Sequence, residues 1–395
     1  MIRQTDNENR GTCHRLVLMA RFFVVLFSLL SGLARAAPYT PHSDDQILAR
    51  LSPAEQAVGQ AAPIHSEADA IRNARQWIDT ARSREDARFL GYAQAVLSPY
   101  LSSSQSAPVQ LLQAEIEQYQ HAFPQARLRL TQLLNKRPDE GQAWLMLANL
   151  DRIQGRFDTA RQSCQRAATS LPPTTVIICL ASIQSMTGQL EQAWSTLLRL
   201  EDNQQLSLQR SERQWLYTLL AEMAIQQGLN SEAHSYLERA LQPSPNDPYL
   251  RYLQSDLWLS EGAHADVISS LQSWQDRDNA LLRLAVAAKR SQHPDASRWR
   301  EAYRSRLQDS QRAGRSIHHR EQARFLLSVM DQPQQALQAA QANWQEQREL
   351  SDLRILLASA VKENDPQTLQ GARDFMDKNN LRDVMAQQWT KEEQR

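Results

Sequence analysis

Glycine and aromatic residues are scarce in this sequence: the 395 residues include 11 glycines, and 7% are aromatic. Proline occurs 16 times and cysteine three times. β-Sandwiches and β-barrels need more glycine-rich turns and β-branched residues, so the composition favours helix and argues against these folds. With 42% hydrophobic and 22% charged residues, the chain can bury a core, which excludes a highly charged disordered chain.

The chain also lacks an excess of charge of either sign, since 44 basic residues face 44 acidic ones. A dedicated nucleic-acid binder would carry a clear positive excess, so we expect no nucleic-acid partner. Residues 1–36 hold five of the basic and two of the acidic residues, which leaves 39 basic and 42 acidic residues in the rest of the chain.

Only one long apolar run stands out, at residues 22–33. It follows several arginines and precedes the small-x-small sequence that ends at Ala36, which is the pattern of a cleaved signal peptide. We therefore expect residues 1–36 to be a signal peptide that is cleaved after Ala36. Residues 37–65 are polar and contain proline, and they predict an extended N-terminal arm.

Two alternatives remain open for this first segment. Residues 16–33 could serve as an uncleaved inner-membrane anchor, although Arg21 would then lie inside the membrane at a cost. Translation could start at Met1 or at Met19, because Met19 by itself opens a compact signal peptide. Any membrane contact is expected only through this segment, if it is uncleaved.

The clearest motif in the rest of the chain is residues 141–173. Two amphipathic helices are expected to meet at Gly155, where glycine allows a left-handed turn, and Pro172 and Pro173 block continuation of the second helix. Apolar and small residues recur there at fixed spacing: Trp144, Leu147, Ala148, Phe157, Ala160, Ala167 and Pro172. In these residues the segment resembles the tetratricopeptide repeat family.

Neighbouring segments repeat this pattern at about 34 residues. The small residue of each expected second helix falls at positions 93, 126, 160, 193, 233, 267, 302, 336 and 369, and turn glycines fall at 155, 188, 228 and 262. His121 stands where one further turn glycine is expected. The resemblance implies an all-α fold, a right-handed α-solenoid of about eight to nine helical hairpins with an inner groove.

The pattern also suggests boundaries along the chain. Residues 66–273 are predicted to form the repeat solenoid, with the strongest repeats at 107–273. Residues 274–378 are predicted to form degenerate hairpins, and residues 379–395 a C-terminal cap or tail.

Sequence motifs for catalysis are nearly absent. The chain has no glycine-rich phosphate loop, no Gly-x-Ser-x-Gly elbow and no His-Glu-x-x-His zinc helix. His318 and His319 would point about 100° apart on a helix, so they cannot share one ion there. We expect no enzyme activity, no catalytic residues, no metal and no cofactor.

Binding of another protein is therefore the expected use. The resemblance implies that a partner peptide or helix lies along the concave face formed by the first helices of the hairpins. Mapped onto this sequence, the groove residues would be Tyr119, Asn149, Arg152, Ser182, Met186, Thr218, Glu222, Tyr252 and Asp256. Their mixed apolar and charged character suits a peptide or helix better than a polyanion.

These observations favour a non-catalytic interaction scaffold of a bacterial envelope, exported most plausibly to the periplasm. One alternative is a protein that binds envelope glycan or assists exopolysaccharide secretion, for which Tyr119, Trp215 and Tyr252 are the candidate stacking residues. A metal-delivery factor or an uncharacterised hydrolase is less favoured.

Cys164 and Cys179 both fall on apolar helix faces, where a disulfide or two buried thiols would fit.

Overall fold

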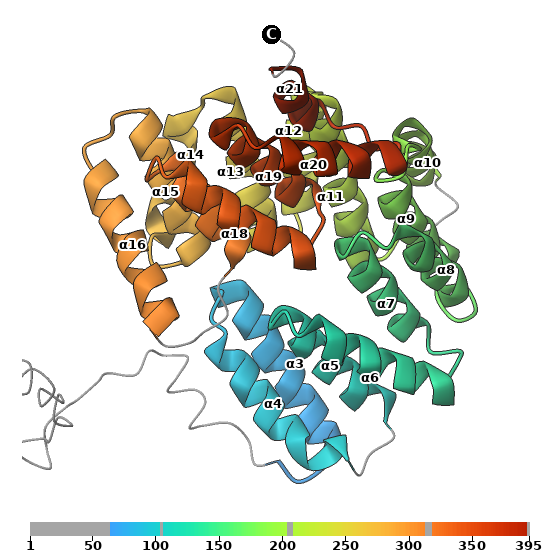
Figure 1. The fold of residues 1–395 in the computed structure, drawn as a ribbon. Helices are drawn as coiled ribbons and strands as arrows, with labels where there is room; N and C mark the ends of the chain where they lie inside the picture. The colour runs from blue at the N-terminus through green and yellow to red at the C-terminus, as the bar shows by residue number, and fades with distance from the viewer. Residues whose placement is uncertain (1–63, 103–105, 204–207, 313–317, 393–395) are drawn as a thin grey trace, which may run out of the picture. The chain divides into compact units, whose positions relative to one another are not determined.

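The computed structural model describes residues 64–102, 106–203, 208–312 and 318–392. The expected signal peptide, the alternative anchor and nearly all of the N-terminal arm lie outside the described residues. Residues 64–395 belong to one compact unit. Every regular element in the described part is a helix (Figure 1).

Within the described ranges nine helical hairpins follow one another, so the expected α-solenoid of about eight to nine hairpins is confirmed. The first five are α3(Glu67–Arg84) with α4(Arg88–Leu101), α5(Ala107–Tyr119) with α6(Phe123–Lys136), α7(Gly141–Ile153) with α8(Phe157–Ala167), α9(Pro173–Gln184) with α10(Leu190–Asp202), and α11(Arg210–Gln227) with α12(Asn230–Leu241). The other four are α13(Pro248–Glu261) with α14(His264–Leu271), α15(Asp278–Arg290) with α16(Ala296–Arg312), α17(His319–Ser328) with α18(Pro333–Glu346), and α19(Leu350–Glu363) with α20(Pro366–Lys378). A short 3₁₀ helix at Gln272–Trp274 follows α14, and α21(Val384–Glu392) follows the ninth hairpin.

Each hairpin turns through one residue in the left-handed conformation. Four of these residues are the glycines expected from the sequence, with φ between 71° and 78°. The other five turns use side-chain-bearing residues with φ between 53° and 57°: Glu85, His121, Gln292, Asp331 and Asn364. His121 thus takes the glycine-like conformation that the repeat spacing predicted for its position.

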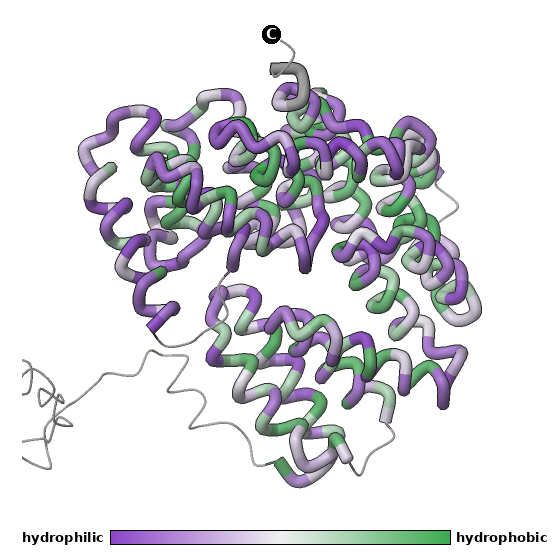
Figure 2. Tube along the Cα trace, viewed as in Figure 1, coloured by the Kyte–Doolittle hydropathy of each residue, from purple (hydrophilic) through white to green (hydrophobic). Residues whose placement is uncertain are grey.

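The small residues of the second helices let the paired helices approach closely. At eight of the nine predicted positions, from Ala93 to Leu369, the residue is at most 1% exposed. Ala302 on α16 is the exception and is partly buried. Most helices carry both hydrophilic and hydrophobic segments, as amphipathic helices do (Figure 2).

The later hairpins keep this form although the sequence motif fades there. Pro333 and Pro366 each begin a second helix, α18 and α20, where the fixed φ of proline suits the first turn. Asp365 caps α20, because its side chain accepts hydrogen bonds from the backbone N–H groups of Gln367 and Thr368, both at 3.1 Å.

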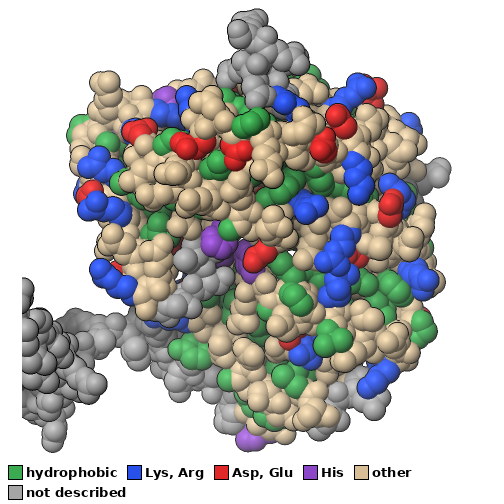
Figure 3. Space-filling model, viewed as in Figure 1, with side chains coloured by type: hydrophobic (Ala, Val, Ile, Leu, Met, Phe, Trp, Pro, Cys, Tyr) green, Lys and Arg blue, Asp and Glu red, His purple; other side chains and the backbone are tan. Residues whose placement is uncertain are grey.

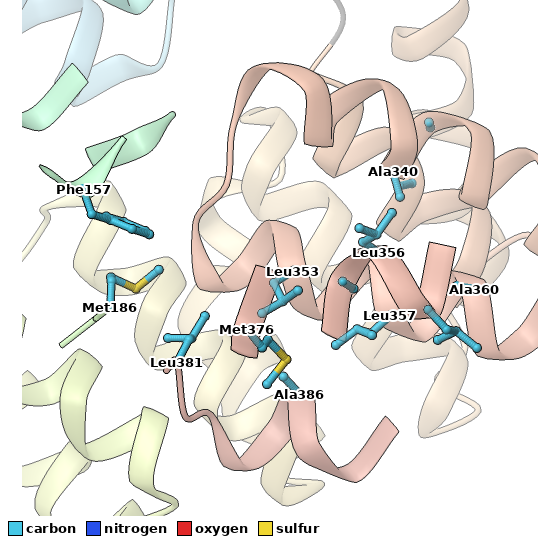
Figure 4. Packing of buried hydrophobic residues seen from close by; sticks show 14 of the residues in the cluster. Phe157, Met186, Ala340, Leu353, Leu356, Leu357, Ala360, Met376, Leu381 and Ala386 are labelled. Carbon is cyan, nitrogen blue, oxygen red and sulfur yellow. The ribbon is translucent and has the colours of Figure 1, made fainter. Parts of the chain in front are cut away.

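The solenoid folds back on itself. The largest apolar cluster joins Phe157 and Met186, from the third and fourth hairpins, to Leu353, Met376 and Leu381 near the end of the chain. Figure 4 shows Phe157 and Met186 on one side of this cluster, with Met376 of α20 and Leu381 of the connection after α20 on the other. Residues of the last hairpins and of the segment after them therefore pack against the third and fourth hairpins.

Among the described helices, none combines the length and the apolar character that a membrane-spanning helix requires.

Candidate functional site

The predicted groove residues lie on the first helices of successive hairpins, and the structure brings several of them to the chain's own later helices. Arg152 on α7 forms an ion pair with Glu349, which caps α19, at 3.0 Å across 197 positions of sequence. Both side chains are about a quarter exposed, at 24% and 28%. The guanidinium that was expected to meet a partner thus meets this chain.

Glu349 is the centre of a wider polar cluster. Arg320 on α17 contacts Glu349 at 3.5 Å and Asp352 at 3.3 Å. Burial would raise the pKa of Glu349, but the charges of Arg152 and Arg320 hold it below its usual value. Asp352 is 1% exposed, and burial together with the charge of Glu349 raises its pKa to about 6 despite Arg320.

Glu222 on α11 has a different neighbour. The hydroxyl of Tyr249, in the first turn of α13, donates a hydrogen bond to its carboxylate. Burial raises the pKa of Glu222, while this hydrogen bond and the charge of Arg152 oppose the rise. The ring of Tyr249 is nevertheless 58% exposed, so it adds an accessible aromatic surface to the inner face.

Tyr252 and Asp256, further along α13, are both held within the fold. Tyr252 is 6% exposed, and its hydroxyl donates to Glu85 at the turn of the first hairpin. Asp256 accepts hydrogen bonds from Arg283 at 2.7 and 2.9 Å and pairs with Arg324 at 2.7 Å. Burial alone would raise the pKa of Asp256, but the two guanidinium groups lower it to about 2.

Three more predicted residues make local contacts. The hydroxyl of Ser182 donates to the Cys179 carbonyl at 2.7 Å, and that of Thr218 to the Gln214 carbonyl at 2.8 Å, both within their own helices. Met186 is 4% exposed and packs in the apolar cluster with Leu381. The partner-binding role of all three stays a prediction.

The turns of the second to fourth hairpins are in contact with two later connections, the one between α18 and α19 and the one after α20. The backbone N–H of Arg348 donates to the Ile153 carbonyl at 2.7 Å, and the amide of Gln347 lies 2.8 Å from Nδ1 of His121. At the next turn, a Cβ on Gly188 would lie 2.6 Å from the amide nitrogen of Asn380. The turn glycine here thus also allows close approach of another segment.

Apart from Tyr249, the accessible residues of the inner face lie on the first three hairpins. Tyr119 on α5 is 40% exposed, with the Arg82 guanidinium 5.5 Å from its ring centre. Arg82 also forms an ion pair with Glu115, and its side chain is 50% exposed. Asn149 is exposed and accepts a hydrogen bond from Arg152 at 3.3 Å. This set, Arg82, Glu115, Tyr119 and Asn149, is called the open inner face below.

Cys164 on α8 and Cys179 on α9 are joined in a disulfide, with their Cα atoms 5.9 Å apart. The bond links the third hairpin to the fourth. No group of three or more metal-ligating side chains occurs in the described part of the chain. The ring of His318 packs edge-on against His121, with centroids 5.1 Å apart.

The central hairpins match a known repeat family in sequence. Residues 111–173, which span α5 to the start of α9, match the tetratricopeptide repeat family. No curated protein matches it in sequence.

Solved tetratricopeptide-type structures resemble the fold at low identity. A tetratricopeptide repeat protein from Parabacteroides merdae is 11% identical, with 73% of this chain and 99% of that chain covered and a TM-score of 0.36. The Rap protein complexed with competence and sporulation factor is 12% identical, with coverage of 83% and 100% and a TM-score of 0.47. The human IFIT1 dimer with PPP-AAAA is 13% identical, with coverage of 74% and 68% and a TM-score of 0.47.

Sequence reasoning missed the residues that complete these contacts. Glu349, Arg320, Tyr249 and Arg348 lie outside the repeat positions that define the inner face. Their partners are far away in sequence, as the 197 positions between Arg152 and Glu349 show. The 34-residue pattern carries no signal for such a pairing, because it reports only how adjacent hairpins pack.

Proposed function

We propose that this chain is a non-catalytic scaffold of a bacterial envelope, which captures a segment of another protein on its open inner face. The observation that carries the proposal is the contrast along the inner face. Residues on α9, α11 and α13 are largely used within the fold, whereas Tyr119 and Asn149 on α5 and α7 are exposed.

The chemistry of the open inner face suits a protein segment. An exposed tyrosine ring, an exposed amide and the Arg82–Glu115 pair supply apolar contact, hydrogen bonding and both signs of charge. Charges of both signs are also scattered over the visible face of the molecule, with no field of one sign (Figure 3). A polyanion would favour a basic surface instead.

The glycan alternative rests on exposed aromatic rings. Of its three candidates, Tyr252 is buried at 6% exposure and Trp215 is partly buried between two apolar clusters. Tyr119 remains, and Tyr249 is a second exposed ring on the inner face. Since the neighbours of both rings are charged side chains, a protein segment is the better fit.

Partner capture from envelope extracts tests the proposal. The full-length protein is immobilised, bound material is identified, and the affinity of the recovered protein is then measured for variants. We expect Tyr119→Ala combined with Asn149→Ala to weaken binding at least tenfold. Leu128→Ala, which alters a 59% exposed side chain on α6, is the matched control and should leave binding unchanged. Recovery of polysaccharide without a protein partner would contradict the proposal.

Arg152 is unsuitable for this test. Its substitution would remove the ion pair with Glu349 and would therefore disturb the fold as well as the surface. The export part of the proposal is checked separately by N-terminal sequencing of the native protein, for which we expect a start at Ala37. An intact Met1 or Met19 would contradict cleavage.

A further inference from the structure

Helix α21 and the connection before it cover an inner surface of the fourth and fifth hairpins. This docking segment is defined as residues 379–389. Leu381, at 4% exposure, and Ala386, at 0%, pack in the cluster that contains Met186. Met385 packs in a second cluster with Ile225 of α11. Met186 is one of the groove residues expected from the sequence, so the docking segment covers part of the surface where a partner of the solenoid would lie.

Polar contacts fix the backbone of the docking segment. Gln226 on α11 is 2% exposed, and its amide donates to the Arg382 carbonyl at 2.6 Å and to the Ser185 carbonyl at 3.0 Å. One buried amide thereby links the end of α9 to the segment. Contact with a backbone carbonyl recognises an extended peptide without regard to its side chains, as in peptide-binding grooves.

Asp383 supplies the specific contact. It is 1% exposed and accepts hydrogen bonds from Arg354 on α19 at 3.1 and 2.5 Å. It also accepts from the backbone N–H of Ala386 at 2.7 Å, which caps the start of α21. A buried carboxylate with a paired guanidinium and a helix cap demands an acidic residue at this position.

The covered area is limited to one side of the segment. Arg382, Val384 and Gln388 are exposed, with Val384 at 40%. The contact therefore depends on Leu381, Asp383 and Ala386, together with the partly buried Trp389. This spacing describes a short amphipathic helix with an acidic residue at its start.

We propose that the docking segment is an intramolecular ligand of the fourth and fifth hairpins, and that the surface it covers binds an amphipathic helix of the same pattern from a partner. The pattern begins with an aliphatic residue, which is Leu381 in this chain. An acidic residue follows two positions later (Asp383), a small residue five positions later (Ala386) and an aromatic residue eight positions later (Trp389). The inference extends the proposed function, because it assigns a second, covered part of the inner face and the chemistry of its occupant.

The test uses the full chain and a labelled peptide with the sequence of residues 379–392. Leu381→Ala combined with Trp389→Ala weakens the segment's own contact without touching the surface beneath it. We expect this variant to bind the peptide at least tenfold more tightly than the unaltered protein does. Gln388→Ala, an exposed change in the same helix, should behave as the unaltered protein. A peptide with lysine in place of Asp383 should bind the variant at least tenfold more weakly.

Hydrogen exchange gives the second measurement. Backbone amides at the end of α9 and along α11 should exchange faster in the double variant, and added peptide should slow them again. A folded double variant that binds the peptide no better than the unaltered protein would overturn the proposal. If the double variant unfolds, Trp389→Ala alone is measured in the same way, and global unfolding of this milder variant would also overturn it.

This experiment needs no external partner. A failed peptide test leaves capture on Tyr119 and Asn149 intact, and failed capture leaves the peptide test intact. The two proposals can therefore be rejected separately.

Discussion

Substitution of Gly188 by alanine tests directly whether the chain's end is packed against the row of turns. Gly188 has φ of 74°, and a Cβ there would lie 2.6 to 2.9 Å from three atoms of Asn380. Gly262 has nearly the same φ, 78°, and a Cβ there would meet nothing within 4 Å. Alanine at either position would therefore suffer the same backbone strain. Only at position 188 would its methyl group also clash with a neighbouring residue.

The magnitudes follow from these two costs. A left-handed alanine costs about 1 kcal/mol relative to glycine, so Gly262→Ala should lower the free energy of unfolding by about 1 kcal/mol. Forcing a methyl group into an occupied position adds about 1 to 3 kcal/mol, so Gly188→Ala should cost about 2 to 4 kcal/mol. Gly228→Ala should lower the free energy of unfolding by about as much as Gly262→Ala does, because its Cβ would lie 3.6 Å from Val384, an ordinary contact distance.

Urea unfolding followed by circular dichroism measures these differences. Asn380→Gly provides the decisive background, since Asn380 has φ of 48° and glycine there removes the obstructing side chain without backbone strain. In that background the cost of Gly188→Ala should fall to that of Gly262→Ala. Equal costs at Gly188 and Gly262 in the unaltered protein would refute close packing of Asn380 on this turn.

Three further changes should alter stability. Reduction of the Cys164–Cys179 disulfide, which spans 15 positions, should lower the free energy of unfolding by about 3 kcal/mol. The difference is measured by comparing urea titrations with and without dithiothreitol. Equal free energies in the two titrations would mean that the bond is absent in solution. A double-mutant cycle of Arg152→Met and Glu349→Gln should give a coupling free energy of about 1 kcal/mol, because both side chains are partly exposed. If the effects of the two substitutions on stability simply add, the two side chains do not form an ion pair in solution. Burial, with help from the charge of His318, lowers the pKa of His121 from 6.5 to about 4. Between these two pH values the unfolded chain therefore binds more protons than the folded protein does. The free energy of unfolding should fall by about 1.4 kcal/mol per pH unit, and by up to about 3 kcal/mol in total, as pH falls from 6.5 to 4. His121→Asn should remove this dependence while tolerating the left-handed turn, and an unchanged pH profile would contradict it.

The hairpins could be predicted because their determinants are local. Helical periodicity, turn glycines such as Gly155 and small residues such as Ala160 all act within one hairpin or between neighbours. The turn at Gln292 carries no such signal, because a side-chain-bearing residue that is uncommon in the left-handed conformation occupies it. The adjacent helices hold such residues in place, and the strain of each is offset by packing.

The sequence indicates which helices carry the groove residues, but it does not indicate which side chains those residues contact. Arg152 and Asp256 lie on the first helices of their hairpins, yet their charges are balanced by Glu349, Arg283 and Arg324 of the same chain. Repeat spacing identifies which side of a helix faces inward. It cannot identify what lies there, because that depends on how nine hairpins curve together.

The closure of the solenoid also explains why charged residues such as Arg152 and Asp256 are paired within the chain. In an open groove, side chains such as Asp256 would be hydrated and free to pair with a partner. Once a later helix covers them, each buried charge needs a counter-charge or a hydrogen bond within the chain, or the fold loses several kcal/mol. Asp256 with two arginines and Asp383 with Arg354 meet this requirement. Tyr119 and Asn149 are exposed and face no such demand, which leaves them available for a partner.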